Sequence, residues 1–271
     1  MRNRIIVACA GVPAILLVLY LLPEPFTPAM IAVLSAIGTY EAMGAMGMNH
    51  PRLALYTAAL AMAIPFWVYF GEKRILGLLV LLAYLVLIFL EAFASSFRVK
   101  VEKVGAAFFF ALFIAYCLSS VVRLGNLYLR DYYIALPIFL PFIVDAAAML
   151  TGMHLGRRSI TPNLSPHKTL EGCIGGLVFG IAACLLYGLG VHLVTGATAN
   201  YYFLAVYGLL GGIMTQIGDL AFSYIKRTRK IKDFSGLLPG HGGVLDRFDS
   251  VIFCAPLVEL LIHYFPAFRL G

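Results

Sequence analysis

The sequence has few charged residues. Asp, Glu, Lys and Arg make up 12% of its 271 residues, whereas about 25% is usual in a soluble domain. Hydrophobic residues make up 62% of the chain, and the mean hydropathy is +0.93. One water-soluble core cannot bury this much apolar surface, so the composition predicts an integral membrane protein. The net charge of +7 is then expected beside membrane spans on the cytoplasmic side, and no nucleic-acid partner is predicted.

Cysteine is sparse too, and its spacing excludes two kinds of site. The five cysteines include no Cys-x-x-Cys pair and lie in or beside apolar runs. We therefore interpret them as small buried hydrophobic residues and not as metal ligands or disulfide partners. The basic start of the chain and the apolar run after it resemble a signal peptide. No small-residue cleavage site is evident along the run to Leu22, which predicts a retained first span.

Long apolar runs, by contrast, are abundant. A helix needs about 20 apolar residues to cross the hydrocarbon core. The windows that meet this requirement are 4–22, 28–47, 53–70, 75–94, 104–122, 132–151, 172–195, 201–223 and 250–266. The predicted fold is therefore an all-α polytopic membrane protein with about nine transmembrane helices. We divide it into an N-terminal part, 1–131, with about five spans, and a C-terminal catalytic region, 132–271, which carries the candidate site.

The basic residues indicate how the spans are oriented. With a cytoplasmic N-terminus, 15 of the 20 Lys and Arg residues fall in cytoplasmic segments and 5 fall on the other side. Because basic residues accumulate on the cytoplasmic side, this orientation is the favoured one. It places the two longest connections, 152–171 and 224–249, on the same cytoplasmic face.

The first of these connections, with the span before it, holds one group of candidate residues. Asp145 lies within an apolar span, and an ionisable group at that depth usually faces a cavity or a partner. A structural pair with a neighbouring helix is the alternative. Ser165-Pro166 predicts a helix start whose free N–H groups, with His167 and Lys168, would bind an anion; an ordinary helix start explains the same residues. The glycines that follow favour close helix packing: Gly172, Gly175 and Gly176.

The second connection combines carboxylates, cations and glycines. Asp219 precedes it, and Asp246 and Asp249 are spaced to share one face of a helix. Magnesium is typically held by one or two carboxylates, with waters and substrate phosphates as further ligands, so Asp219 and Asp246 are candidate ligands. The cations nearby suit a substrate with phosphates: Lys226, Arg227, Arg229, Lys230 and Lys232. A polybasic patch on anionic lipid is the alternative, but it does not account for the aspartates or the glycines.

The order of fixed positions from 223 to 249 is distinctive. It reads Ser223, Lys226-Arg227, Lys232-Asp233-Phe-Ser235 and Leu238-Pro239-Gly-His241-Gly242-Gly243-Val-Leu-Asp246-Arg247-Phe-Asp249. This pattern resembles the signature of the phosphatidate cytidylyltransferases, also called CDP-diacylglycerol synthases. Gly218-Asp219-Leu220 with Ser223 resembles the Gly-Asp-Leu-x-x-Ser block of that family.

Two further stretches bear on the resemblance. Residues 165–172 are similar to the family's Ser-Pro-Lys-Lys-Thr-x-Glu-Gly block, with His167 in place of a lysine. The family often has Asp-Thr-Gly-Ala-Tyr where this chain has Asp145-Ala-Ala-Ala-Met149, which keeps the aspartate but leaves the role of this helix open. The similar blocks together cover roughly 145–250, and the first five spans match only in hydropathy.

The resemblance implies an enzyme that makes CDP-diacylglycerol and pyrophosphate from CTP, or dCTP, and phosphatidic acid. Such transfers depend mainly on positioning and charge neutralisation. The resemblance also implies bound magnesium, with potassium as a second cation. The implied metal-binding residues are Asp219 and Asp246, and Asp249 is expected to support them at the metal site. It further suggests a homodimer in the inner (plasma) membrane, with its active site facing the cytoplasm.

The same resemblance, read with the charges, gives the remaining candidate residues. Those expected to act in catalysis are Asp219, Asp246, Lys226, Arg227, Lys232, Asp233, His241, Arg247 and Asp249. Those expected to bind substrate are Ser223, Gly242, Gly243, Asp145, Ser165, Lys168, Thr169 and Glu171. Among them, Lys226, Arg227, Lys232 and Arg247 are the expected phosphate contacts.

Other classes of protein fit the sequence less well. A CDP-alcohol phosphotransferase would carry Asp-Gly-x-x-Ala-Arg, which the sequence lacks. A transporter or binding protein for a phosphorylated or anionic lipid or solute would use polar residues at the midplane, whereas here they crowd one predicted face. A scaffold for anionic lipids would need the cations but not the aspartates.

The topology leads to a labelling prediction. Cysteines introduced as Thr198→Cys and Ser235→Cys should react with a membrane-impermeant thiol reagent from opposite sides, because the eighth predicted span separates them. Labelling in intact and permeabilised cells, with the parent protein as the control, measures this. Reaction of both cysteines from one side would contradict the nine-span arrangement for this half of the chain.

Overall fold

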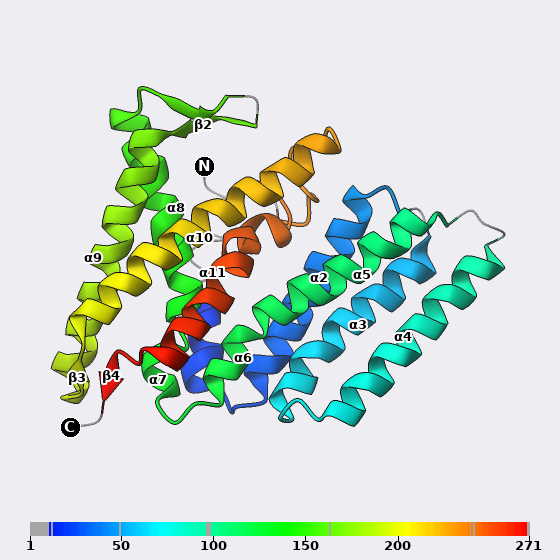
Figure 1. Ribbon diagram of the computed structural model, residues 1–271, viewed down its shortest axis with the longest axis horizontal. Helices are drawn as coiled ribbons and strands as arrows, with labels where there is room; N and C mark the ends of the chain where they lie inside the picture. Colours follow the sequence, from blue (N-terminus) through cyan, green and yellow to red (C-terminus); the bar gives the residue numbers. More distant parts are fainter. Residues whose placement is uncertain are drawn as a thin grey trace. The chain divides into compact units, whose positions relative to one another are not determined.

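The fold was analysed in a computed structural model, which describes residues 11, 13–48, 50–95, 99–162, 164–238, 240 and 242–269. Its regular structure is mostly helical, and the strands it contains form two antiparallel pairs. The predicted all-α fold is therefore confirmed (Figure 1). The chain divides into two compact units: unit 1 comprises Met1–Asn126 and Thr228–Phe248, and unit 2 comprises Leu127–Arg227 and Asp249–Gly271. The predicted division into 1–131 and 132–271 stays a prediction.

Unit 1 is built on a group of long apolar helices. Its elements are η1 (Leu17–Leu21), α2 (Phe26–Ala45), α3 (Pro51–Tyr69), α4 (Arg74–Ala94), α5 (Val101–Leu118) and α6 (Ser120–Gly125). Helices α2, α3 and α5 pack against one another, and α4 packs on α3. In α4 only 11% of the most apolar window is buried within the protein, as expected for a helix that faces lipid.

Unit 2 contains the helices that carry most of the candidate residues. Its elements are α7 (Arg130–Tyr133), α8 (Leu136–Leu155), β1 (Ser159–Thr161), β2 (Ser165–Thr169), α9 (Leu170–Thr195), β3 (Thr198–Ala199), α10 (Tyr201–Thr228), α11 (Leu245–Tyr264) and β4 (Phe268–Arg269). The first four residues of α11 and the last residue of α10 belong to unit 1. Near the C-terminus, β4 pairs with β3, and the Phe268 N–H donates to the hydroxyl of Tyr133 at 2.7 Å.

Glycines allow α8, α9 and α10 to approach closely within unit 2. A Cβ at Gly172 would lie 2.7 Å from the carbonyl oxygen of Ala148 on α8, and one at Gly176 would lie 3.0 Å from the carbonyl oxygen of Val144. A Cβ at Gly208 on α10 would lie 2.5 Å from the Cα of Ile181 on α9. The predicted role of the glycines in close helix packing is therefore confirmed.

The predicted helix start at Ser165-Pro166 is wrong. Residues 165–169 form strand β2, which pairs antiparallel with β1, and α9 begins at Leu170. The N-cap is Thr169, whose Oγ1 accepts a hydrogen bond from the Gly172 N–H at 3.2 Å. Proline favours an extended residue before it and is tolerated in an edge strand, so Ser165-Pro166 extends instead of starting the helix. Ser165 and His167 therefore lie in a strand and not at a helix N-terminus.

Among the described residues, seven helices are long and apolar enough to cross a membrane. They correspond to the second through eighth predicted windows and support an integral membrane protein. The first window lies partly outside the described residues. The ninth falls in α11, which is not one of the seven and carries Asp246, Arg247, Asp249 and Glu259. The count of nine and the orientation remain predictions.

The close approach at Gly208 can be tested with a matched pair of substitutions. Gly208→Ala should destabilise the protein by about 1–3 kcal/mol, because the added methyl group meets the backbone of α9. Gly190→Ala is the control, since nothing lies within 4 Å of a Cβ there and alanine favours a helix over glycine. Thermal unfolding of the purified proteins in detergent measures both. Equal unfolding temperatures for the two variants would contradict the packing.

Candidate active site

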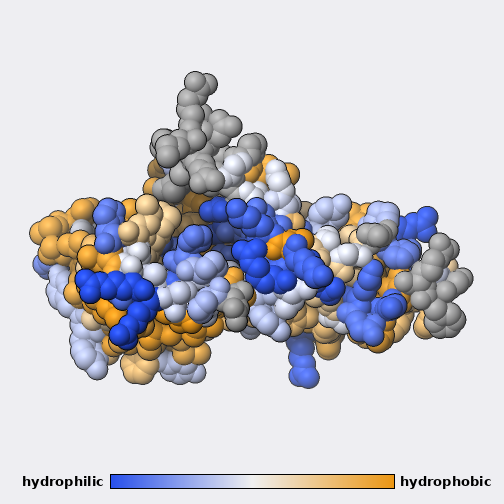
Figure 2. Space-filling view, turned by 90° about the horizontal axis from the view of Figure 1, so that it is seen from above, coloured by the Kyte–Doolittle hydropathy of each residue, from blue (hydrophilic) through white to orange (hydrophobic). Residues whose placement is uncertain are grey.

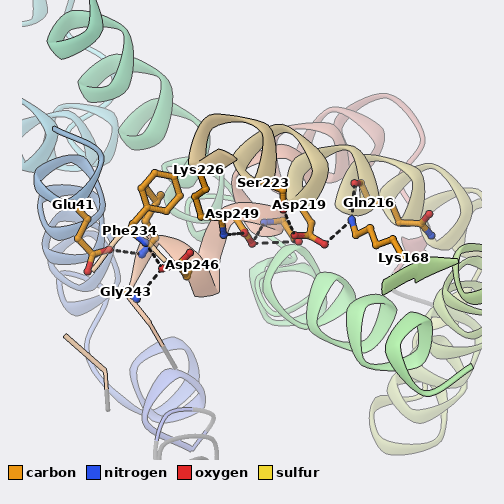
Figure 3. Close-up of polar contacts among 12 residues, drawn as sticks. Glu41, Lys168, Gln216, Asp219, Ser223, Lys226, Phe234, Gly243, Asp246 and Asp249 are labelled. Atoms are coloured by element: carbon orange, nitrogen blue, oxygen red, sulfur yellow. Dashed lines mark hydrogen bonds and ion pairs between the residues drawn. The ribbon is translucent and has the colours of Figure 1, made fainter. Parts of the chain in front are cut away.

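Asp219 is the centre of one polar cluster in unit 2 (Figure 3). It lies on α10, and its Oδ2 is 2.6 Å from the Nζ of Lys168, at the end of the β1–β2 hairpin. One turn further along α10, the Ser223 hydroxyl donates to Asp219 Oδ1 at 3.5 Å. The Lys168 ammonium also donates to the backbone oxygen of Gln216 at 3.5 Å. The Lys168 and Asp219 side chains are 21% and 31% exposed, so water reaches this pair and a ligand can rearrange it.

Asp249 and Lys226 form a second and more buried pair in unit 2. Lys226 Nζ lies 3.9 Å from Asp249 Oδ2, and the side chains are 11% and 9% exposed. The Ser250 N–H donates to the other carboxylate oxygen of Asp249 at 2.7 Å. Gly218 permits this arrangement, because a Cβ there would lie 3.0 Å from the backbone oxygen of Asp249. Removing one member of such a buried pair leaves a charge that neither water nor a partner compensates.

The β1–β2 hairpin is held to its neighbours both at its base and at its turn. The Glu171 carboxylate accepts hydrogen bonds from the backbone N–H groups of Arg157 and Arg158 at 3.0 and 3.3 Å. Arg227 Nε donates to the backbone oxygen of Leu164 at 3.4 Å. Glu171, together with the N-cap Thr169, therefore fixes the start of α9 and the position from which Lys168 reaches Asp219.

In unit 1, Asp246 closes the loop that precedes α11. Its Oδ2 accepts hydrogen bonds from the backbone N–H groups of Phe234 at 2.8 Å and Gly243 at 2.9 Å (Figure 3). Gly242 has a φ of +79°, a conformation that glycine adopts without strain. A Cβ at Gly242 would lie 2.9 Å from Asp246 Oδ2 and 3.3 Å from Asp233 Oδ1. The glycines therefore let the loop close around Asp246.

Glu41, on α2 in unit 1, contacts the same loop and was not predicted from the sequence. Its carboxylate accepts hydrogen bonds from the Ser235 hydroxyl and from the N–H groups of Val244 and Leu245. An acidic residue within an apolar window is the signal that could have identified it, since the same feature drew attention to Asp145.

The remaining candidate residues differ in burial and lie in both units. Lys232, Asp233 and Arg247 are exposed in unit 1. Asp145, on α8, and Ser165 are half-buried in unit 2. His241 and Pro239 lie outside the described residues. Asp246 and Asp249 both lie in α11, at the i, i+3 spacing that places two residues on one helix face.

The described residues contain no group of three or more His, Cys, Asp or Glu side chains that could hold a metal ion. Magnesium does not require such a group, because one or two carboxylates with waters and phosphates are sufficient. The carboxylate oxygens of Asp219 and Asp246 are of the kind that magnesium prefers as ligands. The assignment of Asp219, Asp246 and Asp249 as metal ligands stays a prediction.

On the face shown in Figure 2, hydrophilic residues are exposed among apolar ones. Together with the helices and clusters above, this defines a polytopic membrane protein with carboxylates paired to cations or backbone amides near the ends of its helices. The family described as "Cytidylyltransferase family" matches residues 2–265, and the chain belongs to this family. The resemblance found in the sequence is thereby confirmed.

The curated relatives include several bacterial phosphatidate cytidylyltransferases. The chain is 33% identical to the one from Bacillus subtilis (strain 168) over 198 residues, which is 72% of this chain and 68% of that protein. It is 33% identical to the one from Staphylococcus saprophyticus over 156 residues, and 35% identical to the one from Staphylococcus aureus (strain COL) over 156 residues. Each of these two matches covers 55% of this chain and 58% of the staphylococcal protein.

The buried pair in unit 2 yields a stability prediction. Lys226→Met should cost about 3–5 kcal/mol, because it leaves Asp249 buried without its cation. Lys226→Met combined with Asp249→Asn should recover most of that stability, since no charge is then stranded. Thermal unfolding in detergent measures the difference, with exposed Arg229→Met as the control. If the single and double variants unfold at the same temperature, the two side chains are not a coupled pair.

Proposed function

We propose that this protein transfers the cytidylyl group of CTP to phosphatidic acid, which gives CDP-diacylglycerol and pyrophosphate for phospholipid biosynthesis. A phosphate oxygen of phosphatidic acid forms a new bond to the α-phosphorus of CTP. The bond from that phosphorus to the bridging oxygen of the β-phosphate breaks, and pyrophosphate leaves with the electron pair. Membership of the cytidylyltransferase family and similarity to the bacterial phosphatidate cytidylyltransferases support this reaction.

The structural support for this proposal comes from helix α10. Helix α10 is long and apolar enough to span a membrane, and its last turns hold Asp219, Ser223, Lys226 and Arg227. A lipid phosphate and a water-soluble nucleotide have to meet at the end of such a helix, where lipid gives way to water. Since the reacting groups are all anionic, cations at that point reduce their repulsion.

Magnesium is proposed as the cofactor, with Asp219 and Asp246 as its ligands, Asp249 in support and potassium as a second cation. Bound magnesium would neutralise charge on the phosphates and hold them in place. Lys168 is paired with Asp219 in this structure. If magnesium replaced the lysine ammonium beside that carboxylate, Lys168 would be available as a proposed phosphate contact. Lys226, Arg227, Lys232 and Arg247 are further proposed phosphate contacts.

The proposal also covers the oligomeric state of the enzyme, its membrane and its orientation. We propose a homodimer in the plasma membrane with its active site facing the cytoplasm. The 15 basic residues assigned to cytoplasmic segments, against 5 on the other side, support this orientation. No finding favours a transporter or an anionic-lipid binding protein.

The reaction is tested by pyrophosphate release from purified protein with CTP, phosphatidic acid and magnesium. Asp219→Asn and Asp246→Asn change charge with little change in shape, and each should lower turnover by about 100- to 1000-fold while the protein stays folded, as when one charge-stabilising group is lost. The double variant should lose little more, because groups that act as one unit are not additive. Exposed Asp131→Asn is the matched control and should retain full turnover.

The outcomes separate the reaction from the metal assignment. No release from the parent protein would overturn the proposed reaction. Near-normal turnover by either aspartate variant, with an unchanged magnesium requirement, would overturn that residue as a ligand.

A further inference from the structure

Glu41 is a buried carboxylate in an apolar helix. Its relative exposure is 5%, and it lies in α2, whose length and hydropathy suit a membrane span. A buried carboxylate is costly unless hydrogen-bond donors compensate for the lost water. Glu41 therefore depends on whatever donates to it, and those donors all lie in the segment 235–245 of the same unit.

Three donors from both ends of that segment reach Glu41. Oε1 accepts from the Ser235 hydroxyl at 2.5 Å and from the Val244 N–H at 3.0 Å, and Oε2 accepts from the Leu245 N–H at 2.7 Å. A Cβ at Gly243 would lie 2.5 Å from Oε2. A side chain at position 243 would therefore displace the Glu41 carboxylate from the backbone that it contacts.

Two of these donors are at the N-terminus of α11. Leu245 is its first residue, and N–H groups at a helix start have no partner within the helix. A carboxylate there satisfies the N–H groups and also interacts favourably with the positive end of the helix dipole. Here the carboxylate comes from α2, 204 residues earlier than Leu245, and not from the residue just before the helix.

The next residue along the chain is Asp246, whose carboxylate holds Phe234 and Gly243. The loop 234–244 is therefore closed by two carboxylates, one at the start of α11 and one from α2. If Glu41 releases Val244 and Leu245, the first turn of α11 loses its cap, and the direction of the Asp246 side chain is no longer fixed.

We propose that Glu41 is a positioning residue for the cytidylyl transfer: by capping α11 and holding Ser235, it fixes the loop 234–244 and orients Asp246. The proposal rests on the proposed role of Asp246. Glu41 acts through the loop, so its loss lowers turnover without removing a group that contacts substrate.

Three conservative substitutions separate the effects of the Glu41 charge, the length of its side chain and the number of its hydrogen bonds. Glu41→Gln keeps the size of the side chain but places an amide N–H₂ where a hydrogen-bond acceptor is needed. Glu41→Asp keeps both acceptor oxygens on a shorter chain. Ser235→Ala removes one of the three donors and leaves the cap of α11 in place. Glu91→Gln is the matched control, because Glu91 is also a glutamate in a membrane-spanning helix of unit 1, paired at 4.0 Å with the exposed Arg52.

Amide hydrogen exchange of the purified full-length protein is the first measurement. In Glu41→Gln, peptides covering 234–245 should exchange at least about tenfold faster, as expected when hydrogen bonds to a charged group are lost. Peptides from α9 and α10 should be unchanged, and so should all peptides of Glu91→Gln. Glu41→Asp and Ser235→Ala should give smaller increases in exchange rate, confined to the same segment. If Glu41→Gln does not fold, these two variants provide the test.

Turnover is the second measurement. Pyrophosphate release should fall by about tenfold or more in Glu41→Gln and be partly restored in Glu41→Asp, with Glu91→Gln at the parent level. Unchanged exchange at 234–245 overturns the positioning role, and so does faster exchange with normal turnover. If the parent protein releases no pyrophosphate, the proposed function fails, while the exchange result still decides whether Glu41 holds the loop.

Discussion

The structure depends on how a few carboxylates are compensated in an apolar chain. A carboxylate away from water needs a cation or hydrogen-bond donors, because the surroundings supply neither. Asp219 and Asp249 are compensated by lysine ammonium groups, and Asp246 and Glu41 by backbone N–H groups. Asp246 closes the loop that precedes it, and the other three carboxylates join segments that lie further apart in the sequence. The carboxylates therefore also determine which segments are held together.

Lysine side chains and backbone N–H groups differ in how easily they can leave a carboxylate. A lysine side chain can rotate away from a carboxylate while the backbone stays where it is, so the half-buried pair of Lys168 and Asp219 can open for a ligand. A backbone N–H cannot leave without a change in the loop that carries it. The pairings of Asp246 and Glu41 with backbone groups therefore suit a fixed frame, whereas the lysine pairings suit a site that exchanges partners during turnover.

Most of the fold and much of the site could be predicted from local patterns. Apolar windows identified the helices, and the polar positions from 223 to 249 pointed to the family. The start of α9 was missed because Ser165-Pro166 is compatible with both a helix start and a strand, and the pairing with β1 decides between them. An acidic residue within an apolar window marks Glu41 as unusual, but its contacts are with residues about 200 positions away, and no local pattern records those.

The glycine contacts between α8 and α9 also bear on the order in which the chain assembles. These two helices are joined by the short β1–β2 hairpin and meet through Gly172 and Gly176. Their contacts are therefore local in sequence and require little loop-closure entropy. The pairing of β4 with β3, and the bond from Phe268 to Tyr133, join residues 71 and 135 positions apart. A helical hairpin can thus form as soon as α9 has entered the membrane, while unit 2 closes only when Phe268 and Arg269 have been made.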